Sequence, residues 1–209
     1  MKRILFLIFM FVSVSFCYAQ DFQSVEPMDI QKEDKIKTHF GLVGGYNHSR
    51  ISKFYNARHK GGFYAGAMLE LVGEKNVSVQ FDLVYTQMGV RLKNQETLLS
   101  PRQNDRILMN YLALSYVGKY YVEQFYLQGG FQLALLLKAK EEVDGSTTSI
   151  REISTPYDGG IILGCGYTIT KNLYIDVRGY IGLQSIYKEE LELVEKYNYN
   201  LSFGMGFKF

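Results

Sequence analysis

Apolar and polar residues alternate with a period of two from about residue 38 to residue 209. In one clear stretch Val77, Val79 and Phe81 are separated by Ser78 and Gln80. This period places alternate side chains on opposite faces of a β-strand, one apolar and one polar. Eight such segments can be drawn, each near the roughly 9–11 residues that a tilted strand needs to cross a bilayer: 38–47, 61–72, 76–89, 108–120, 125–137, 157–168, 172–184 and 197–209.

The connections between these segments alternate in length. Three are short, at 73–76, 121–124 and 169–172, and four are long and polar, near 48–60, 90–106, 138–156 and 185–196. Membrane barrels have short turns on the periplasmic side and long loops outside. Eight strands with both ends in the periplasm require three turns and four loops. The pattern therefore predicts an all-β fold, an eight-stranded antiparallel up-and-down transmembrane β-barrel over 38–209.

Alternation alone does not say which face points inward. A soluble periplasmic barrel would turn its apolar face to a ligand, whereas a membrane barrel turns it to lipid. The polar faces here consist largely of Gly, Ala, Ser and Gln, which fit the narrow interior of eight strands. Aromatic residues near strand ends are typical of interfacial girdles: Tyr85, Tyr116, Tyr120, Phe125, Tyr126, Tyr174 and Phe209. These features favour the membrane barrel, and the soluble barrel with an apolar ligand is the alternative.

The two ends of the chain carry export signals. Lys2 and Arg3 precede an apolar stretch at 4–14, and Ala19 lies before Gln20, as at a signal-peptide cleavage site. We expect a cleaved signal peptide over 1–19 and a mobile polar tail over 20–37. At the other end, one set of residues resembles the signal by which the outer-membrane barrel assembly machinery recognises its clients: Ser202, Gly204, Phe207 and Phe209. An apolar edge strand is available for such recognition until the barrel closes.

Several segments together resemble the outer-membrane β-barrel family known as porin-family or PorT-family proteins. They include FGLVGGYNHS at 40–49, SVQFDLVYTQMG at 78–89, YDGGIILGCGYTI at 157–169 and the closing FGMGFKF. The resemblance implies an eight-stranded barrel in the outer membrane of a Gram-negative bacterium, and it implies no particular activity. Because eight strands enclose a narrow lumen, we do not expect a general porin.

Charge and chemistry exclude several functions. Without residues 1–19 the chain has 21 basic and 21 acidic side chains, so it lacks the basic excess of a nucleic-acid-binding protein. Cys165 is then the one cysteine, which precludes an intrachain disulfide. The spacing of His39, His48 and His59 is not that of a zinc site. We expect no metal and no cofactor.

Five charged residues fall on polar strand faces, close to the short turns: Glu70, Asp82, Lys119, Asp176 and Arg178. Charges confined in a narrow lumen are costly unless they are paired. We therefore predict a salt-bridged polar plug in the periplasmic half of the lumen. The alternative is a proton or ion path through the same residues.

These observations predict a non-enzymatic integral outer-membrane barrel with a structural, adhesive or envelope-assembly role. The alternative is a barrel enzyme that modifies lipid, for which Ser49 and His48 are the candidate pair. Basic residues in the first two outer loops could bind lipopolysaccharide phosphates: Arg50, Lys53, Arg58, Lys60, Arg91, Lys93, Arg102 and Arg106. The expected partners are thus membrane lipid and lipopolysaccharide, the assembly machinery, and proteins that contact the outer loops.

Overall fold

The computed structural model describes residues 37–52, 57–73, 76–93, 104–143, 146–186 and 196–209. The predicted signal peptide and nearly all of the predicted tail lie outside these residues. Within the described ranges, no helix is long and apolar enough to cross a membrane. The strands are β1 (Lys37–Ile51), β2 (Ala57–Val72), β3 (Val77–Lys93), β4 (Asn104–Val122), β5 (Phe125–Val143), β6 (Ser146–Ser149), β7 (Tyr157–Thr168), β8 (Leu173–Gly182) and β9 (Asn198–Lys208).

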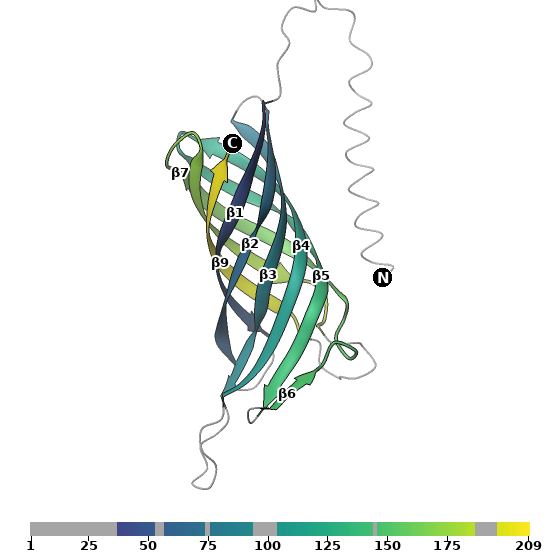
Figure 1. The fold of residues 1–209 in the computed structure, drawn as a ribbon. Helices are drawn as coiled ribbons and strands as arrows, with labels where there is room; N and C mark the ends of the chain where they lie inside the picture. The colour runs from purple at the N-terminus through teal and green to yellow at the C-terminus, as the bar shows by residue number, and fades with distance from the viewer. Residues whose placement is uncertain (1–36, 53–56, 74–75, 94–103, 144–145, 187–195) are drawn as a thin grey trace, which may run out of the picture. The chain divides into compact units, whose positions relative to one another are not determined.

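Eight of these strands form a closed antiparallel barrel (Figure 1). Each pairs with its neighbour in the chain, β5 pairs with β7, and β9 pairs with β1 from Gly41↔Lys208 to Ile51↔Asn198. The short β6 pairs with the end of β5 and stands outside the ring. The prediction of an eight-stranded up-and-down barrel is confirmed. Because the ring is closed, each of its strands has a hydrogen-bonded neighbour on both sides, as the backbone of a sheet in hydrocarbon requires.

The short connections all lie at one end of the barrel, which we call the turn end; the opposite end is the loop end. At the turn end, Asn76 and Glu123 have φ values of 65° and 58°, the left-handed backbone that tight turns require. The C-terminus lies at this end and β6 lies at the loop end (Figure 1).

Five strands, β1 to β5, reach further toward the loop end than the sequence predicted, whereas β8 ends at Gly182 and is shorter than predicted. β1 continues to Ile51, β3 to Lys93 and β5 to Val143, so the predicted loops 48–60, 90–106 and 138–156 are too wide. Pairing of β3 with β4 continues without a break to Lys93↔Asn104. The outward apolar pattern stops before the strands do, because the polarity of the barrel wall reverses near the loop end.

This reversal is clear in the rows of side chains that run across β3, β4 and β5. Leu83, Leu114 and Leu133 form one outward row, and each is about half exposed. The next row toward the loop end is Tyr85, Leu112 and Leu135, which is still apolar. Beyond it polar side chains enter the outward rows: Gln87, Asn110 and Lys138 form the next row, Gly89, Leu108 and Lys140 the following one, and Arg91, Arg106 and Glu142 the third.

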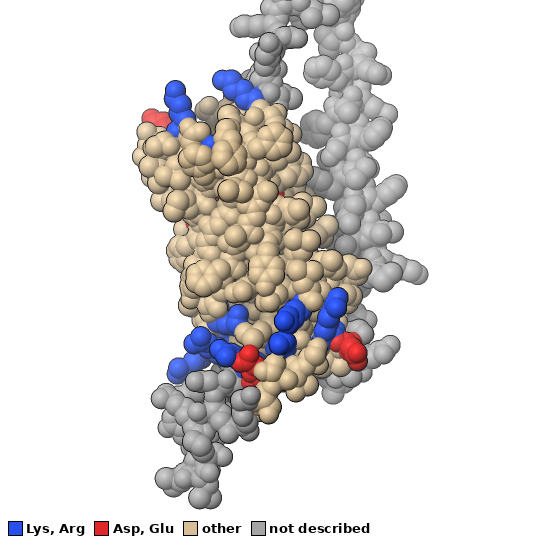
Figure 2. Space-filling view, in the orientation of Figure 1, with Lys and Arg blue, Asp and Glu red and all other residues tan. Residues whose placement is uncertain are grey.

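The inward side chains change in the opposite sense. Gln80, Asp82 and Ser115 are buried near the turn end, whereas Met88, Val90, Ile107 and Met109 are buried near the loop end. In the view of Figure 2, charged side chains gather at the two ends and are almost absent from the broad zone between. An apolar outer wall suits lipid, and a polar outer wall around an apolar interior suits water. The turn-end part of the barrel therefore has the surface of a membrane-embedded wall.

A charge introduced on either side of this reversal is expected to have very different effects. Leu114 and Asn110 lie on the same outward face of β4, four residues apart. Leu114→Arg places a charge within the apolar band and should lower the free energy of unfolding by about 2–4 kcal/mol, whereas Asn110→Arg should cost about 0–1 kcal/mol. Urea titration of the barrel in lipid vesicles measures both. Equal losses would show that the apolar band does not end where the rows change.

Candidate functional site

Glu70 is the centre of one buried cluster inside the turn end. Its carboxylate accepts hydrogen bonds from Ser78 Oγ and Tyr121 OH, each at 2.6 Å. Lys208 forms an ion pair with it, and Lys119 Nζ lies 3.5 Å from Glu70 Oε1. Glu70 comes from β2, Lys119 from β4 and Lys208 from β9, so the cluster ties distant strands together across the lumen.

Lys119 is held by aromatic rings as well as by charge. Its Nζ lies 4.6 Å from the ring centroid of Tyr126 and 4.5 Å from that of Tyr174. A cation over aromatic faces gains electrostatic stabilisation, most of all where water is excluded. Lys119 is 2% exposed, so these rings replace hydration that the ammonium has lost.

Arg178 is the centre of a second cluster. Its Nη1 donates to Asp82 Oδ2 at 2.5 Å, and its Nε donates to Asp176 Oδ2 at 2.8 Å. Gln80 Nε2 donates to Asp82 Oδ1 at 2.5 Å, and Gln128 Nε2 lies 3.3 Å from Asp176 Oδ2. One guanidinium lies between two carboxylates, and a side-chain amide also donates to each carboxylate, which stabilises buried charges.

The structure thus places all five predicted plug residues in the barrel interior, in these two clusters. Lys208 is a sixth member that the sequence analysis missed. The five predicted residues carry three acidic and two basic side chains, and this imbalance was a signal that a cation was missing. With Lys208 the set is neutral, and we call it the charged layer: Glu70, Asp82, Lys119, Asp176, Arg178 and Lys208.

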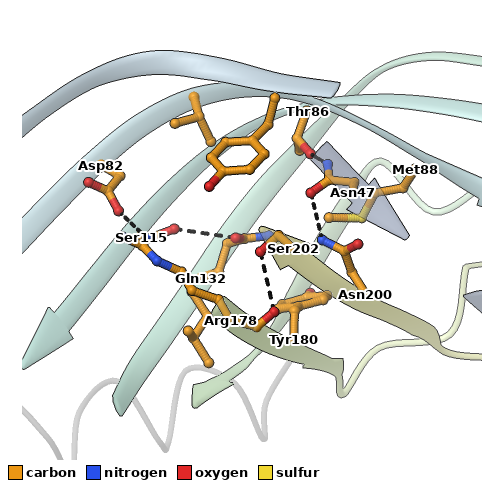
Figure 3. A pocket seen from close by; sticks show the side chains of 13 residues that line it. Asn47, Asp82, Thr86, Met88, Ser115, Gln132, Arg178, Tyr180, Asn200 and Ser202 are labelled. Atoms are coloured by element: carbon orange, nitrogen blue, oxygen red, sulfur yellow. Dashed lines mark hydrogen bonds and ion pairs between the residues drawn. The ribbon is translucent and has the colours of Figure 1, made fainter. Parts of the chain in front are cut away.

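The middle of the lumen contains a cavity of about 30 Å³ (Figure 3). Asp82 and Arg178 line it on one side and Met88 on the other. Polar side chains between them are bonded to one another, as where Asn47 Nδ2 donates to Thr86 Oγ1 at 2.6 Å. A cavity of this size has room for only a few water molecules.

A buried apolar layer fills the lumen at the loop end, and the sequence analysis did not predict it. Three of its side chains, those of Ile51, Val90 and Ala139, come from strand extensions that were predicted as loops. Two come from the connections: Ile150 N donates to Ala139 O at 3.1 Å, and Ile186 O accepts from Thr155 N at 2.8 Å. The members of this apolar layer are Ile51, Met88, Val90, Ile107, Met109, Leu136, Ala139, Ile150 and Ile186.

The candidate enzymatic pair is separated by the barrel wall. Ser49 is 2% exposed, and its Oγ lies 3.0 Å from Gly89 O and 3.2 Å from Lys60 O. His48 is exposed, and its ring centroid lies 4.8 Å from that of His59. Neighbouring residues of a strand point to opposite faces, so this serine and this histidine do not meet. Within the described ranges, no group of three or more His, Cys, Asp or Glu side chains is placed to bind a metal ion.

The residues of the predicted assembly signal divide between the two faces of β9. Phe207 and Phe209 are exposed, with ring centroids 5.6 Å apart, while Ser202 is buried. Gly204 has a role in the lumen, because a Cβ at this position would lie 2.0 Å from Tyr64 OH and 2.6 Å from Asp176 Oδ1. Recognition by the assembly machinery stays a prediction.

Comparison with solved structures gives similar chains. Neisserial surface protein A superposes with a TM-score of 0.53 at 18% sequence identity, covering 81% of this chain and 97% of that protein. Ail, the attachment invasion locus protein of Yersinia pestis, gives a TM-score of 0.49 at 14% identity, covering 83% of this chain and 100% of Ail. At such identities the likeness to the Neisserial protein shows the fold alone.

Comparison with curated protein sequences gave no match. The model of one family, described as the outer membrane protein beta-barrel domain, matches residues 18–188. This match covers most of the chain, and the structure supplies the closed eight-stranded ring and the apolar outer band that such a protein needs. The chain therefore belongs to the outer membrane protein beta-barrel domain family, and it is a β-barrel of the Gram-negative outer membrane.

Proposed function

We propose that this protein is a closed, non-enzymatic outer-membrane barrel with a structural, adhesive or envelope-assembly role. Its turn end faces the periplasm, and its loop end projects from the membrane toward lipopolysaccharide and external partners. The polarity reversal along β3, β4 and β5 supports this orientation, because the wall is polar where the loops begin and apolar toward the short turns.

The main support for this proposal is that two layers of side chains fill the lumen. The charged layer occupies the turn end and the apolar layer occupies the loop end, with about 30 Å³ left between them. A solute would have to displace paired charges and then a packed apolar layer. The barrel therefore acts through its surface, and this also argues against an apolar ligand held in the lumen.

The separation of Ser49 from His48 supports the non-enzymatic part of the proposal. A hydroxyl is activated as a nucleophile when a base lies within hydrogen-bond reach, and here the barrel wall stands between them. We also propose that the barrel assembly machinery recognises β9 before β9 pairs with β1, since that pairing removes the last free edge of the sheet.

Electrical recording and lipid assay test the two parts of this proposal together. The wild-type barrel in a planar bilayer is expected to give no stable open-pore conductance. Ser49→Ala and His48→Ala should leave the composition of added outer-membrane lipids unchanged relative to wild type, as judged by mass spectrometry. A large steady conductance would contradict the closed barrel. Lipid modification that is lost in either folded variant would contradict the non-enzymatic role.

A further inference from the structure

Three lysines line a groove on the outer wall of the barrel, just beyond the last apolar row. The groove has a volume of about 250 Å³. Lys138 and Lys140 come from β5, and Lys60 comes from β2. We call it the lysine groove, and its other lining residues are Gln87, Leu108, Asn110 and Glu142.

Strand register explains how these side chains come together. Gln87 pairs with Asn110 and Asn110 pairs with Lys138, so one row presents two amides and an ammonium. In the next row Gly89 pairs with Leu108, which pairs with Lys140. Gly89 has a φ of 142° and no side chain, and a Cβ there would lie 2.0 Å from Ile107 O, so the backbone of β4 approaches it closely.

The side chain of Lys60 packs against Gly89. A Cβ on Gly89 would lie 3.1 Å from Lys60 Cδ, so the lysine stem passes over the glycine. Lys60 is 7% exposed and its Nζ donates to Met88 O at 3.3 Å, which occupies one of its three donors. Arg91 and Arg106 are close enough to repel its charge, and Glu142 is close enough to attract it.

The groove has an excess of positive charge. Its one acidic residue, Glu142, forms an ion pair with Arg106. Among the residues that the structure describes, no carboxylate forms a salt bridge with Lys138 or Lys140. Among the described residues the ammonium groups of Lys138 and Lys140 therefore have no salt-bridge partner, and they lie beside amide donors from Gln87 and Asn110. Phosphate oxygens are the acceptors that such a set would bind through charge-assisted hydrogen bonds.

The apolar outer wall beside the groove indicates that a phosphate bound there would belong to a lipid. The row of Tyr85, Leu112 and Leu135 lies directly next to it, followed by Leu83, Leu114 and Leu133. These apolar residues are 39–51% exposed and would line an acyl chain. A head-and-tail ligand that lies along β3, β4 and β5 would place its phosphate among the lysines.

We propose that the lysine groove binds the phosphate of a phosphorylated glycolipid of the outer leaflet, with its acyl chains along the apolar rows. This inference rests on the proposed orientation, in which the loop end faces outward. It assigns a specific lipid contact to β3, β4 and β5, where the proposed function requires only that the loop end meets lipopolysaccharide. Basic side chains at a membrane surface are known to select anionic headgroups.

Binding of diphosphoryl lipid A to the full-length barrel in neutral detergent micelles tests this proposal. Wild type should bind it at least about tenfold more tightly than the same lipid with its phosphates removed, because each charge-assisted bond is worth about a factor of ten. Lys138→Gln together with Lys140→Gln should abolish this preference. Lys171→Gln, on the short turn at the opposite end, is the matched control and should retain it.

Three results would overturn the proposal: equal binding of the two lipids by wild type, a preference that survives in the double variant, or an equal loss in Lys171→Gln. Displacement of the lipid by an equal concentration of inorganic phosphate would overturn the assignment to a lipid. If the double variant does not fold, Lys138→Gln alone should weaken binding by about threefold or more, since this lysine is exposed. Conductance of the same preparations separates this test from the proposed function. A closed barrel without lipid preference contradicts only the present inference.

Discussion

Arg178→Ala is expected to lower the free energy of unfolding of the barrel by about 3–5 kcal/mol without creating conductance. The guanidinium is the ion-pair partner of both Asp82 and Asp176, and both carboxylates are almost completely buried. Its removal leaves two like charges in a confined space with their amide donors alone. The apolar layer is untouched by this change, so the lumen should remain closed. Urea titration followed by heat-modifiable gel migration measures the stability, and a planar bilayer measures the conductance.

Two further variants make this prediction specific to the buried charges. Arg151→Ala removes an exposed arginine outside the ring and should change stability little. Adding Asp82→Asn and Asp176→Asn to Arg178→Ala should recover much of the lost stability, because the two carboxylates that lost their guanidinium are then neutral amides. A loss in Arg178→Ala as small as that in Arg151→Ala would mean that the charged layer does not stabilise the barrel.

Leu136→Ala is expected to lower the free energy of unfolding by about 2–5 kcal/mol. The Leu136 side chain is 1% exposed and belongs to the apolar layer, so its truncation leaves a cavity among packed side chains. The next residue provides a matched control. Leu137 is 41% exposed on the outer wall, where pairing of β4 with β5 shifts register, and Leu137→Ala should have a much smaller effect.

Urea titration of the two leucine variants in the same lipid distinguishes the apolar layer from the outer wall. Truncation of Leu136 should also make the loop end more accessible, which protease digestion of folded barrels would detect. Similar stability losses for the two variants would contradict a packed interior at the loop end.

Much of the barrel could be predicted from the sequence because a strand has a period of two. The alternation at Val77, Val79 and Phe81 identified an outer face, and the same alternation placed Asp82 and Arg178 inside. It could also have separated Ser49 from His48, because adjacent residues of one strand point to opposite faces. The three short and four long connections were identified as the segments between these alternating stretches.

The length of the strands could not be predicted in this way. At Met88, Val90, Ile107 and Met109 the apolar side chains belong to the inner face, whereas nearer the turn end they belong to the outer face. The alternation continues through this change, but with the polar face on the outside. A prediction that assigns apolar residues to the outer face therefore ends each strand where the outer wall becomes polar.

The sequence by itself thus determined the number of strands in the ring, their antiparallel order and that five charged side chains enter the lumen, because these depend on local periodicity along one chain. Only the tertiary structure decided which of those charges meet, that Lys208 completes the charged layer, and that the wall reverses polarity around an apolar layer. It alone aligned Gln87, Asn110 and Lys138 in one row and brought Lys60 to Gly89. The physical reason is register: pairing between strands is set by closure of the whole ring, and no single segment carries that information.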